Sequence, residues 1–235
     1  MKVPRYYENL NVLHDNTQPA KAYYIPVSSR MDDLIEHREK SYRLQLLNGI
    51  WKFRYLKSIY DAKDAFYEPG YSTQDFDDIE VPGAWQMAGY DTHQYTNIRY
   101  PFPFDPPYVP QDIPCGEYVT TFNYVQDKDA TKAYLNFEGV DSCFYVWVNG
   151  IYVGYSQVSH ATSEFDVSET LKEGENTIAV LVMKWCDGSY LEDQDKFRMS
   201  GIFRDVYILK RPECSIRDYR VRTTVSEEKL KWILI

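Results

Sequence analysis

Hydrophobic and polar residues begin to alternate near residue 46 and continue to do so along most of the chain. Trp51, Phe53 and Tyr55 alternate with Lys52 and Arg54, and a period of two is typical of a half-buried strand. Further segments rich in β-branched and aromatic residues occupy positions 117–124, 132–140, 142–148, 151–157, 176–185 and 202–210. No helical pattern separates them, so we predict an all-β fold, a jelly-roll β-sandwich rather than a parallel sheet.

Two loops interrupt this series of predicted strands. Asn149-Gly150 lies between two of the segments and suits the positive φ angles of a type I′ turn, which predicts a tight hairpin. Residues 100–116 contain six prolines. Because proline cannot donate to a ladder or fit inside a helix, we predict a rigid irregular loop there.

The same pattern divides the chain into parts. Residues 1–45 carry scattered apolar positions, and we interpret them as an N-terminal arm with one or two short helical turns that lies on the domain. The sandwich then takes residues 46–211. After Pro212 two more strand-like segments follow. Since two strands are marginal alone, we interpret residues 212–235 as the start of a second, truncated domain.

Composition and charge narrow the function classes. The chain has 22 Tyr and 5 Trp against 11 Gly, which favours β-structure. Its 26 basic and 35 acidic residues give a net charge of −9, and no basic stripe is interleaved with aromatics, which argues against nucleic acid as a partner. The longest apolar run, residues 178–183, is far shorter than the roughly 20 residues of a membrane-spanning helix.

The cysteines and the N-terminus indicate the compartment. Cys115, Cys143, Cys186 and Cys214 form no CxxC pair, so we expect reduced thiols rather than a zinc site or a disulfide framework. The first ten residues lack the apolar stretch of a secretory signal. This favours the cytoplasm, or the periplasm or exterior if a leader was removed.

Three carboxylates crowd into residues 192–195, directly before Lys196 and Arg198. One interpretation is a solvated acidic turn balanced by the two basic residues. A second is a hard-cation site, although the spacing is not that of the twelve-residue calcium loop. The residues alone do not decide between them.

A third interpretation is glycosidic acid–base chemistry. Glu192 with Asp195, or Asp187 with Asp193, could act across a glycosidic bond. No phosphate-binding or zinc-protease motif occurs and the four histidines stand apart in the sequence, which leaves nucleophilic triads and histidine metal sites unsupported. The tryptophans in strand patterns (Trp51, Trp147 and Trp185) are expected in the core. Aromatic residues near the proline-rich loop suit either sugar stacking or packing: Tyr95, Tyr100, Phe102, Phe104 and Tyr108.

Four stretches together point to a family: LNGIWKF at 47–53, VPGAWQMAGYD at 81–91, YTNIRYPFPFDPPYVP at 95–110 and DGSYLEDQDKFRMSGIFRDV at 187–206. They closely resemble, in order and spacing, the N-terminal part of glycoside hydrolase family 2 β-galactosidases. The resemblance implies a jelly-roll sugar-binding domain, an immunoglobulin-like sandwich starting at residue 212, and a catalytic barrel further on. It places both catalytic glutamates on that barrel, so we expect no catalytic residue here and no activity of this segment alone.

The resemblance also implies residue roles. Asn97 matches an asparagine that hydrogen-bonds a galactose hydroxyl, and an amide suits this because it both donates and accepts. Asp195 matches an aspartate that contacts galactose and ligates sodium. Glu192 and Asp193 are then expected to hold the loop's shape, through hydrogen bonds and pairing with neighbours such as Arg198 or Arg204.

A magnesium site is implied between the arm and the sandwich. Gln157 and Asp187 match ligand positions, and Asn9 is retained in the arm. Tyr6 stands where the family has a carboxylate, which should weaken a hard-cation site.

Three functional hypotheses follow from these observations. The first is the N-terminal sugar-binding domain of a β-galactosidase, with a galactoside as substrate, sodium and magnesium as cofactors, the barrel of the same chain as partner and a homo-oligomer when full length. The second is a stand-alone carbohydrate-binding module. The third is another family 2 glycosidase, such as a β-glucuronidase.

Overall fold

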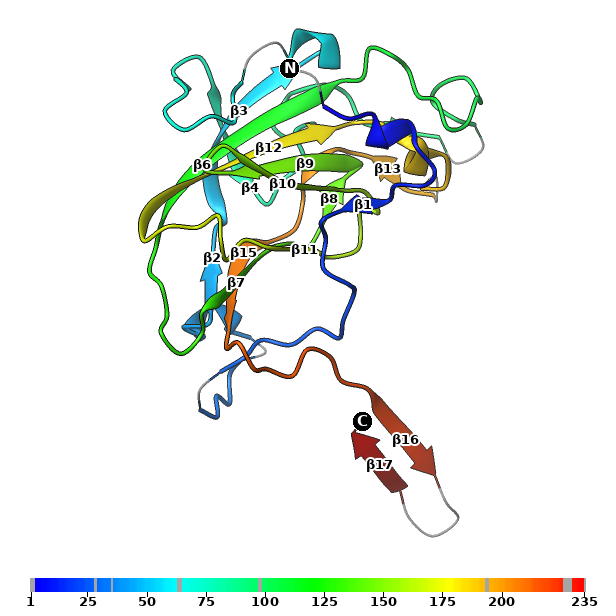
Figure 1. Cartoon of the computed structure of the whole chain (residues 1–235). Coiled ribbons are helices and arrows are strands. Elements are labelled where there is room, and N and C mark those ends of the chain that lie inside the picture. Colours follow the sequence, from blue (N-terminus) through cyan, green and yellow to red (C-terminus); the bar gives the residue numbers. More distant parts are fainter. Residues whose placement is uncertain are drawn as a thin grey trace.

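Two antiparallel sheets packed face to face form the body of the protein (Figure 1). The computed structural model describes residues 3–27, 29–34, 36–62, 65–96, 99–192, 195–225 and 230–234. These residues include no α-helix, and none of their short 3-10 helices is long and apolar enough to cross a membrane. The predicted all-β sandwich is therefore confirmed. Its described connections include the 3-10 helices η1 (Tyr6–Glu8), η2 (Arg38–Lys40), η3 (Ile59–Asp61) and η4 (Asp187–Tyr190).

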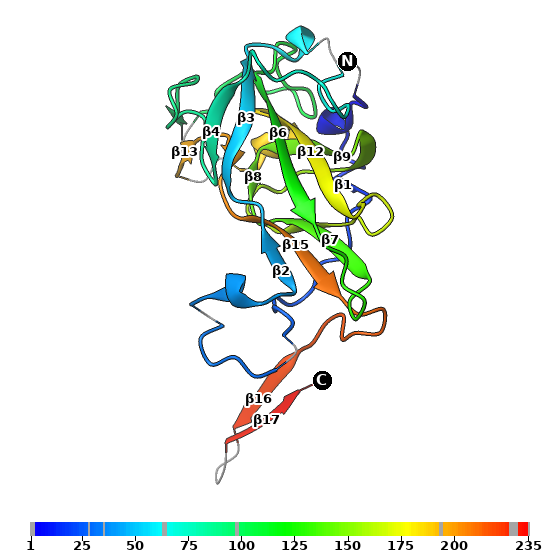
Figure 2. The ribbon, with the colours of Figure 1, turned by 90° about the vertical axis from the view of Figure 1, so that its left-hand side faces the viewer.

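The larger sheet has the strand order β1 (His14–Asp15), β10 (Ile151–Ser156), β9 (Cys143–Val148), β12 (Gly174–Met183), β6 (Cys115–Tyr124), β3 (Gly49–Leu56) and β4 (Asp77–Val81). The smaller sheet has the order β11 (Ser163–Asp166), β7 (Lys132–Phe137), β15 (Val206–Arg211) and β2 (Leu44–Leu46). Figure 2 shows the two sets of strands from the side.

Three short strand pairs lie outside the two sheets: β13 (Phe197–Arg198) with β5 (Gln94–Tyr95), β14 (Gly201–Ile202) with β8 (Val140–Asp141), and β16 (Val221–Val225) with β17 (Leu230–Leu234). The last pair is the hairpin expected after Pro212, and it stands apart from the sandwich in Figure 1.

The local predictions for single strands are confirmed. Trp51 and Phe53 are buried on β3 while Lys52 between them is exposed, as the alternation requires, whereas Arg54 and Tyr55 at the end of the strand are both half-buried. Asn149 and Gly150 have φ angles of 52° and 82°, the left-handed pair that a two-residue hairpin needs.

Strand β12 is buried on both faces because it lies between β9 and β6 in the middle of the larger sheet. Alternate residues face the core between the sheets (Ile178, Val180, Val182) and a second core on the outer face (Ala179, Leu181, Met183). This explains the uninterrupted apolar run at 178–183, since a strand covered on both sides has no polar face.

The second core is covered by loops and the arm rather than by a third sheet. Tyr7 comes from η1, Phe66 and Phe76 from the β3–β4 connection, and Val109 and Ile113 from the proline-rich loop. Residues 100–114 are irregular, as predicted, whereas Cys115 and Gly116 at the end of the predicted loop already belong to β6. The apolar residues of the proline-rich segment help to bury the outer face of the larger sheet. The four cysteines are free thiols, as expected.

The arm adds an edge strand to the larger sheet. His14 and Asp15 of β1 pair with Ser156 and Tyr155 of β10. The helical turn expected in the charged part of the arm is η2. Further along, the arm contacts the segment that leads to the C-terminal hairpin, where the Ala22 amide donates to Asp218 at 2.7 Å.

Candidate functional site

Strand pair β5–β13 brings together two of the stretches that carry the family resemblance, residues 95–110 and the acidic stretch within 187–206. Strand β5 lies at the start of the first and β13 follows the acidic stretch, and Tyr95 pairs with Phe197 across this two-stranded sheet. The Tyr95 hydroxyl donates to the exposed carboxylate of Asp195, which raises the pKa of Tyr95. Asp195 itself has φ = 42°. Asn97, two residues after β5, lies outside the described residues.

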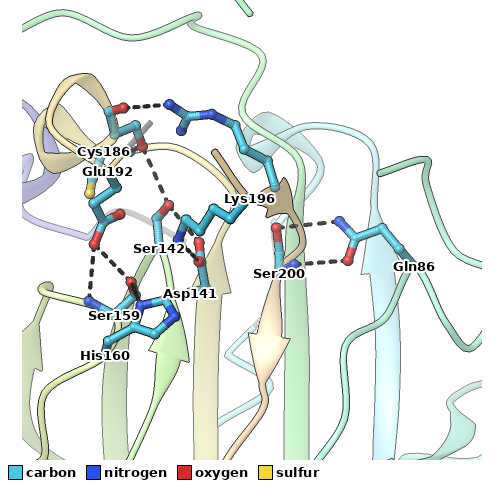
Figure 3. Close-up of polar contacts among 11 residues, drawn as sticks. Gln86, Asp141, Ser142, Ser159, His160, Cys186, Glu192, Lys196 and Ser200 are labelled. Atoms are coloured by element: carbon cyan, nitrogen blue, oxygen red, sulfur yellow. Dashed lines mark hydrogen bonds and ion pairs between the residues drawn. The ribbon is translucent and has the colours of Figure 1, made fainter. Parts of the chain in front are cut away.

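The C-terminal side of the acidic loop is held by contacts to the sandwich. Lys196 Nζ donates at 3.3 Å to Asp141, the last residue of β8. The Arg198 guanidinium donates to the Ser189 carbonyl oxygen of η4 at 2.9 Å. Figure 3 shows the contact between Lys196 and Asp141.

The N-terminal side of the loop is held by Glu192. Its Oε1 accepts the Ser159 hydroxyl at 2.8 Å and the Ser159 backbone N–H at 3.1 Å (Figure 3). Burial, followed by the nearby Asp141 charge, raises the pKa of Glu192. The expected role of Glu192 in holding the loop is therefore seen. Among the described residues, the hydrogen bonds to the Glu192 carboxylate come from Ser159 and not from the expected arginine, and Arg204 donates to the His160 carbonyl. Asp193, for which the same pairing is expected, lies outside the described residues.

A half-open hollow of about 450 Å³ lies beside the loop. It is mainly apolar, and Lys196 and Asp141 stand among its lining residues. Its other lining residues are Ala84, Met87, His160, Phe197, Met199, Ser200 and Phe203. Phe197 is 53% exposed.

The loop aromatics divide between packing and exposure. Phe102 packs edge-on against Trp185 and Tyr190, at centroid distances of 5.1 and 5.2 Å. Tyr100 and Phe104 also contact Tyr190 but remain exposed. Tyr95 and Tyr108 are likewise exposed. The three tryptophans expected in the core, Trp51, Trp147 and Trp185, are buried.

A second polar cluster forms where η4 meets the arm. Asp187 is only 4% exposed, and neither of its carboxylate oxygens has a hydrogen-bond partner among the described residues. Burial raises the pKa of Asp187, the nearby Gln157 side-chain amide and Gly188 backbone N–H offset part of that rise, and the charge of Glu8 adds to it. A buried carboxylate without partners is costly, and a bound cation would remove that cost.

The arm supplies polar groups to this cluster. Helix η1 lies against η4, and Glu8, which the sequence reasoning did not single out, is almost buried there with Oε1 accepting from the Val109 amide at 3.3 Å. Asn9 follows directly. Tyr6 packs its ring on Tyr155 at 5.5 Å. The described residues contain no group of three or more His, Cys, Asp or Glu side chains placed to hold a metal, so a cation here would also depend on amide oxygens.

Sequence comparison identifies a family for most of the chain. Residues 44–212 match the model described as glycosyl hydrolases family 2, sugar binding domain. A β-galactosidase of Actinobacillus pleuropneumoniae is 50% identical over 97% of this chain, and one of Staphylococcus xylosus is 48% identical over 95%. The chain spans only 22% of the length of each of these relatives.

Solved structures with a similar fold include β-glucuronidases. One from Ruminococcus gnavus has a TM-score of 0.63 at 19% identity, covering 91% of this chain and 35% of that one. One from an uncultured Clostridium sp. has a TM-score of 0.56 at 26% identity, covering 80% of this chain and 33% of that one. At 19% identity, the similarity to the Ruminococcus structure supports a shared fold alone.

Proposed function

Because the chain belongs to the sugar-binding domain family of the family 2 glycosyl hydrolases, we propose that it is the sugar-binding domain of an enzyme that hydrolyses terminal β-D-galactosides. The observation that carries this proposal is the 41–50% identity to β-galactosidases over 94–97% of the chain. The remaining length of such an enzyme would hold the catalytic barrel, whose two glutamates act by the retaining mechanism.

In this enzyme Asp195 and Asn97 shape the galactose subsite. The Asp195 carboxylate accepts sugar hydroxyl protons and ligates sodium together with groups of the barrel. The pairing of Tyr95 with Phe197 supports this, since it holds the end of the acidic loop beside the start of the stretch that carries Asn97. Asp195 is exposed, as a contact to a separate domain requires.

The same proposal includes magnesium at the junction of arm and sandwich. Asp187, Gln157 and Asn9 would hold it, and the unpartnered Asp187 carboxylate supports this assignment. Glu8 supplies a second carboxylate nearby. Oxygen ligands of this kind suit a hard cation, and Glu8 offers a carboxylate beside the position where Tyr6 replaces the expected one.

The proposed domain division is an arm at 1–45, the sugar-binding domain at 46–211, and the start of an immunoglobulin-like domain at 212–235, which includes the β16–β17 hairpin. A cytoplasmic homo-oligomer completes the proposal.

The proposal is tested with Asp195→Ala in the full-length enzyme. KM for a galactoside is expected to rise and the response to sodium to weaken, because the sugar and the ion lose a shared carboxylate. Asp129→Asn, in an exposed turn of the sandwich, is the matched control and should leave both unchanged. Kinetics and sodium response identical to wild type in Asp195→Ala would sink the assignment.

Two alternatives make different predictions. The similar fold of β-glucuronidases makes a glucuronide the second candidate substrate. The full-length enzyme is therefore assayed with a galactoside and a glucuronide side by side, and faster turnover of the glucuronide would overturn the proposed substrate. A stand-alone binding module would hold galactose without a barrel, so calorimetry of the 235-residue chain with galactose and lactose should show no tight binding if the galactosidase proposal is right.

A further inference from the structure

The acidic loop is fixed to the sandwich at a point three residues before Asp195. Glu192 accepts two hydrogen bonds from one residue, Ser159, which lies in the connection between β10 and β11. Hydrogen bonds to a charged acceptor are the stronger kind. The segment from Glu192 to Asp195 can span at most about 11 Å, so the position of Glu192 limits where the Asp195 carboxylate can reach.

The backbone before Ser159 is strained. Val158 has φ = 75°, a left-handed conformation that is an outlier for a β-branched residue. Val158 is also partly exposed, so burial of its side chain does not account for the conformation. Strain of this kind persists where surrounding contacts over-determine it, and it clusters at functional sites. Here the turn presents both the N–H and the hydroxyl of Ser159 to Glu192.

The Ser159 hydroxyl is itself oriented. Its oxygen lies 2.8 Å from His160 Nδ1, and because the hydroxyl proton goes to Glu192, the imidazole Nδ1–H donates to this oxygen. His160 in turn packs on Phe203 with ring centroids 5.0 Å apart. A chain of contacts therefore runs from the sandwich through His160 and Ser159 to Glu192 (Figure 3).

We propose that Ser159 is a positioning residue for the sugar site: presented by the strained Val158 turn, it clamps Glu192 and so sets the reach of Asp195. This inference rests on the proposed function, in which Asp195 contacts galactose and sodium. The role is distinct from that of Asp195, because Ser159 acts only through Glu192.

The first test measures the loop in the 235-residue chain by residue-resolved amide hydrogen exchange. Ser159→Ala removes the hydroxyl donor, and exchange of the Glu192 amide, which donates to the Gly188 carbonyl oxygen, is expected to quicken by about tenfold, the equivalent of one hydrogen bond to a charged group. Ser159→Thr keeps the hydroxyl and should restore slow exchange. Ser168→Ala is the control. It also removes a serine hydroxyl that donates to a carboxylate, that of Asp166, but Ser168 follows β11 and lies outside the acidic loop.

The second test uses the same variants in the full-length enzyme. Ser159→Ala is expected to raise KM for the galactoside and the half-saturating sodium concentration by about threefold to tenfold with kcat less affected, and Ser159→Thr should recover both. If Asp195→Ala impairs the enzyme but Ser159→Ala leaves KM and sodium affinity at wild-type values, the positioning role is overturned while the proposed function stands. If Asp195→Ala is also without effect, the proposed function itself has failed.

Discussion

Asp187→Asn should change the stability of this chain in opposite directions with and without magnesium. The wild-type carboxylate is buried and neither oxygen has a hydrogen-bond partner among the described residues. An unsatisfied buried polar group costs about 1–3 kcal/mol. The nearly isosteric amide carries no charge, so in the presence of a chelator at pH 7 the variant should be more stable by about 1–2 kcal/mol. For a domain of this size that is a Tm increase of about 2–8 °C.

Magnesium should reverse the order of stability of the wild-type chain and Asp187→Asn. At 100 times its Kd, a cation bound only by the folded chain adds about 2.7 kcal/mol, which exceeds the gain from the amide. We therefore expect wild type to melt above Asp187→Asn in excess magnesium and below it in chelator. Asp129→Asn, in an exposed turn, should match wild type in both buffers.

The pH dependence provides an independent check of the same carboxylate. Burial raises the pKa of Asp187, so the folded chain binds this proton more tightly than the unfolded chain does. Without a cation, its contribution to the free energy of unfolding is largest below about pH 4 and falls as the pH rises through the raised pKa. Asp187→Asn should lack this fall. Melting by circular dichroism from pH 3.5 to 8 measures it, and a variant less stable than wild type in chelator would refute the reasoning.

Three further predictions concern the backbone and the core. Val158→Gly should leave stability unchanged or raise it by up to about 1 kcal/mol in urea denaturation, because relief of left-handed strain outweighs the added chain entropy; a clear loss would show that Val158 is unstrained. Gly201→Ala should cost about 1–3 kcal/mol, because Gly201 has φ = 128° and a Cβ there would lie 2.7 Å from the Gly83 carbonyl oxygen; a wild-type Tm would contradict this. Leu181→Ala should cost about 3–5 kcal/mol, since Leu181 is fully buried in the outer-face core, whereas a loss below about 1 kcal/mol would mean that this core is loosely packed.

The strands were predictable where local chemistry alone decides them. The alternation around Trp51 and the Asn149-Gly150 turn contain their own structural information, and both predictions are confirmed. The apolar run at 178–183 was predictable as a strand, but its place at the centre of the larger sheet depends on pairing with β9 and β6, which no local pattern encodes.

The site was predictable only in part. The acidic stretch stood out by its charge, yet the strand pair β5–β13, which joins it to the other loop, has two residues in each strand and no detectable period. Glu8 was missed because one acid in an arm without pattern gives no signal, and its burial arises only when η1 meets η4. Ser159 was missed as the partner of Glu192 because an arginine is the more obvious partner for a carboxylate.

The outer face of the larger sheet, covered by loops and the arm, has a consequence for sequence change. In many sandwiches the loops can be exchanged or lengthened freely because the core lies elsewhere. Here Val109 and Ile113 of the proline-rich loop and Tyr190 of η4 belong to a packed core. An engineer who grafts a loop from a relative to alter sugar preference must therefore transplant its buried anchors as well, and natural variation in substrate choice should be accompanied by compensating changes on β9 and β12 beneath.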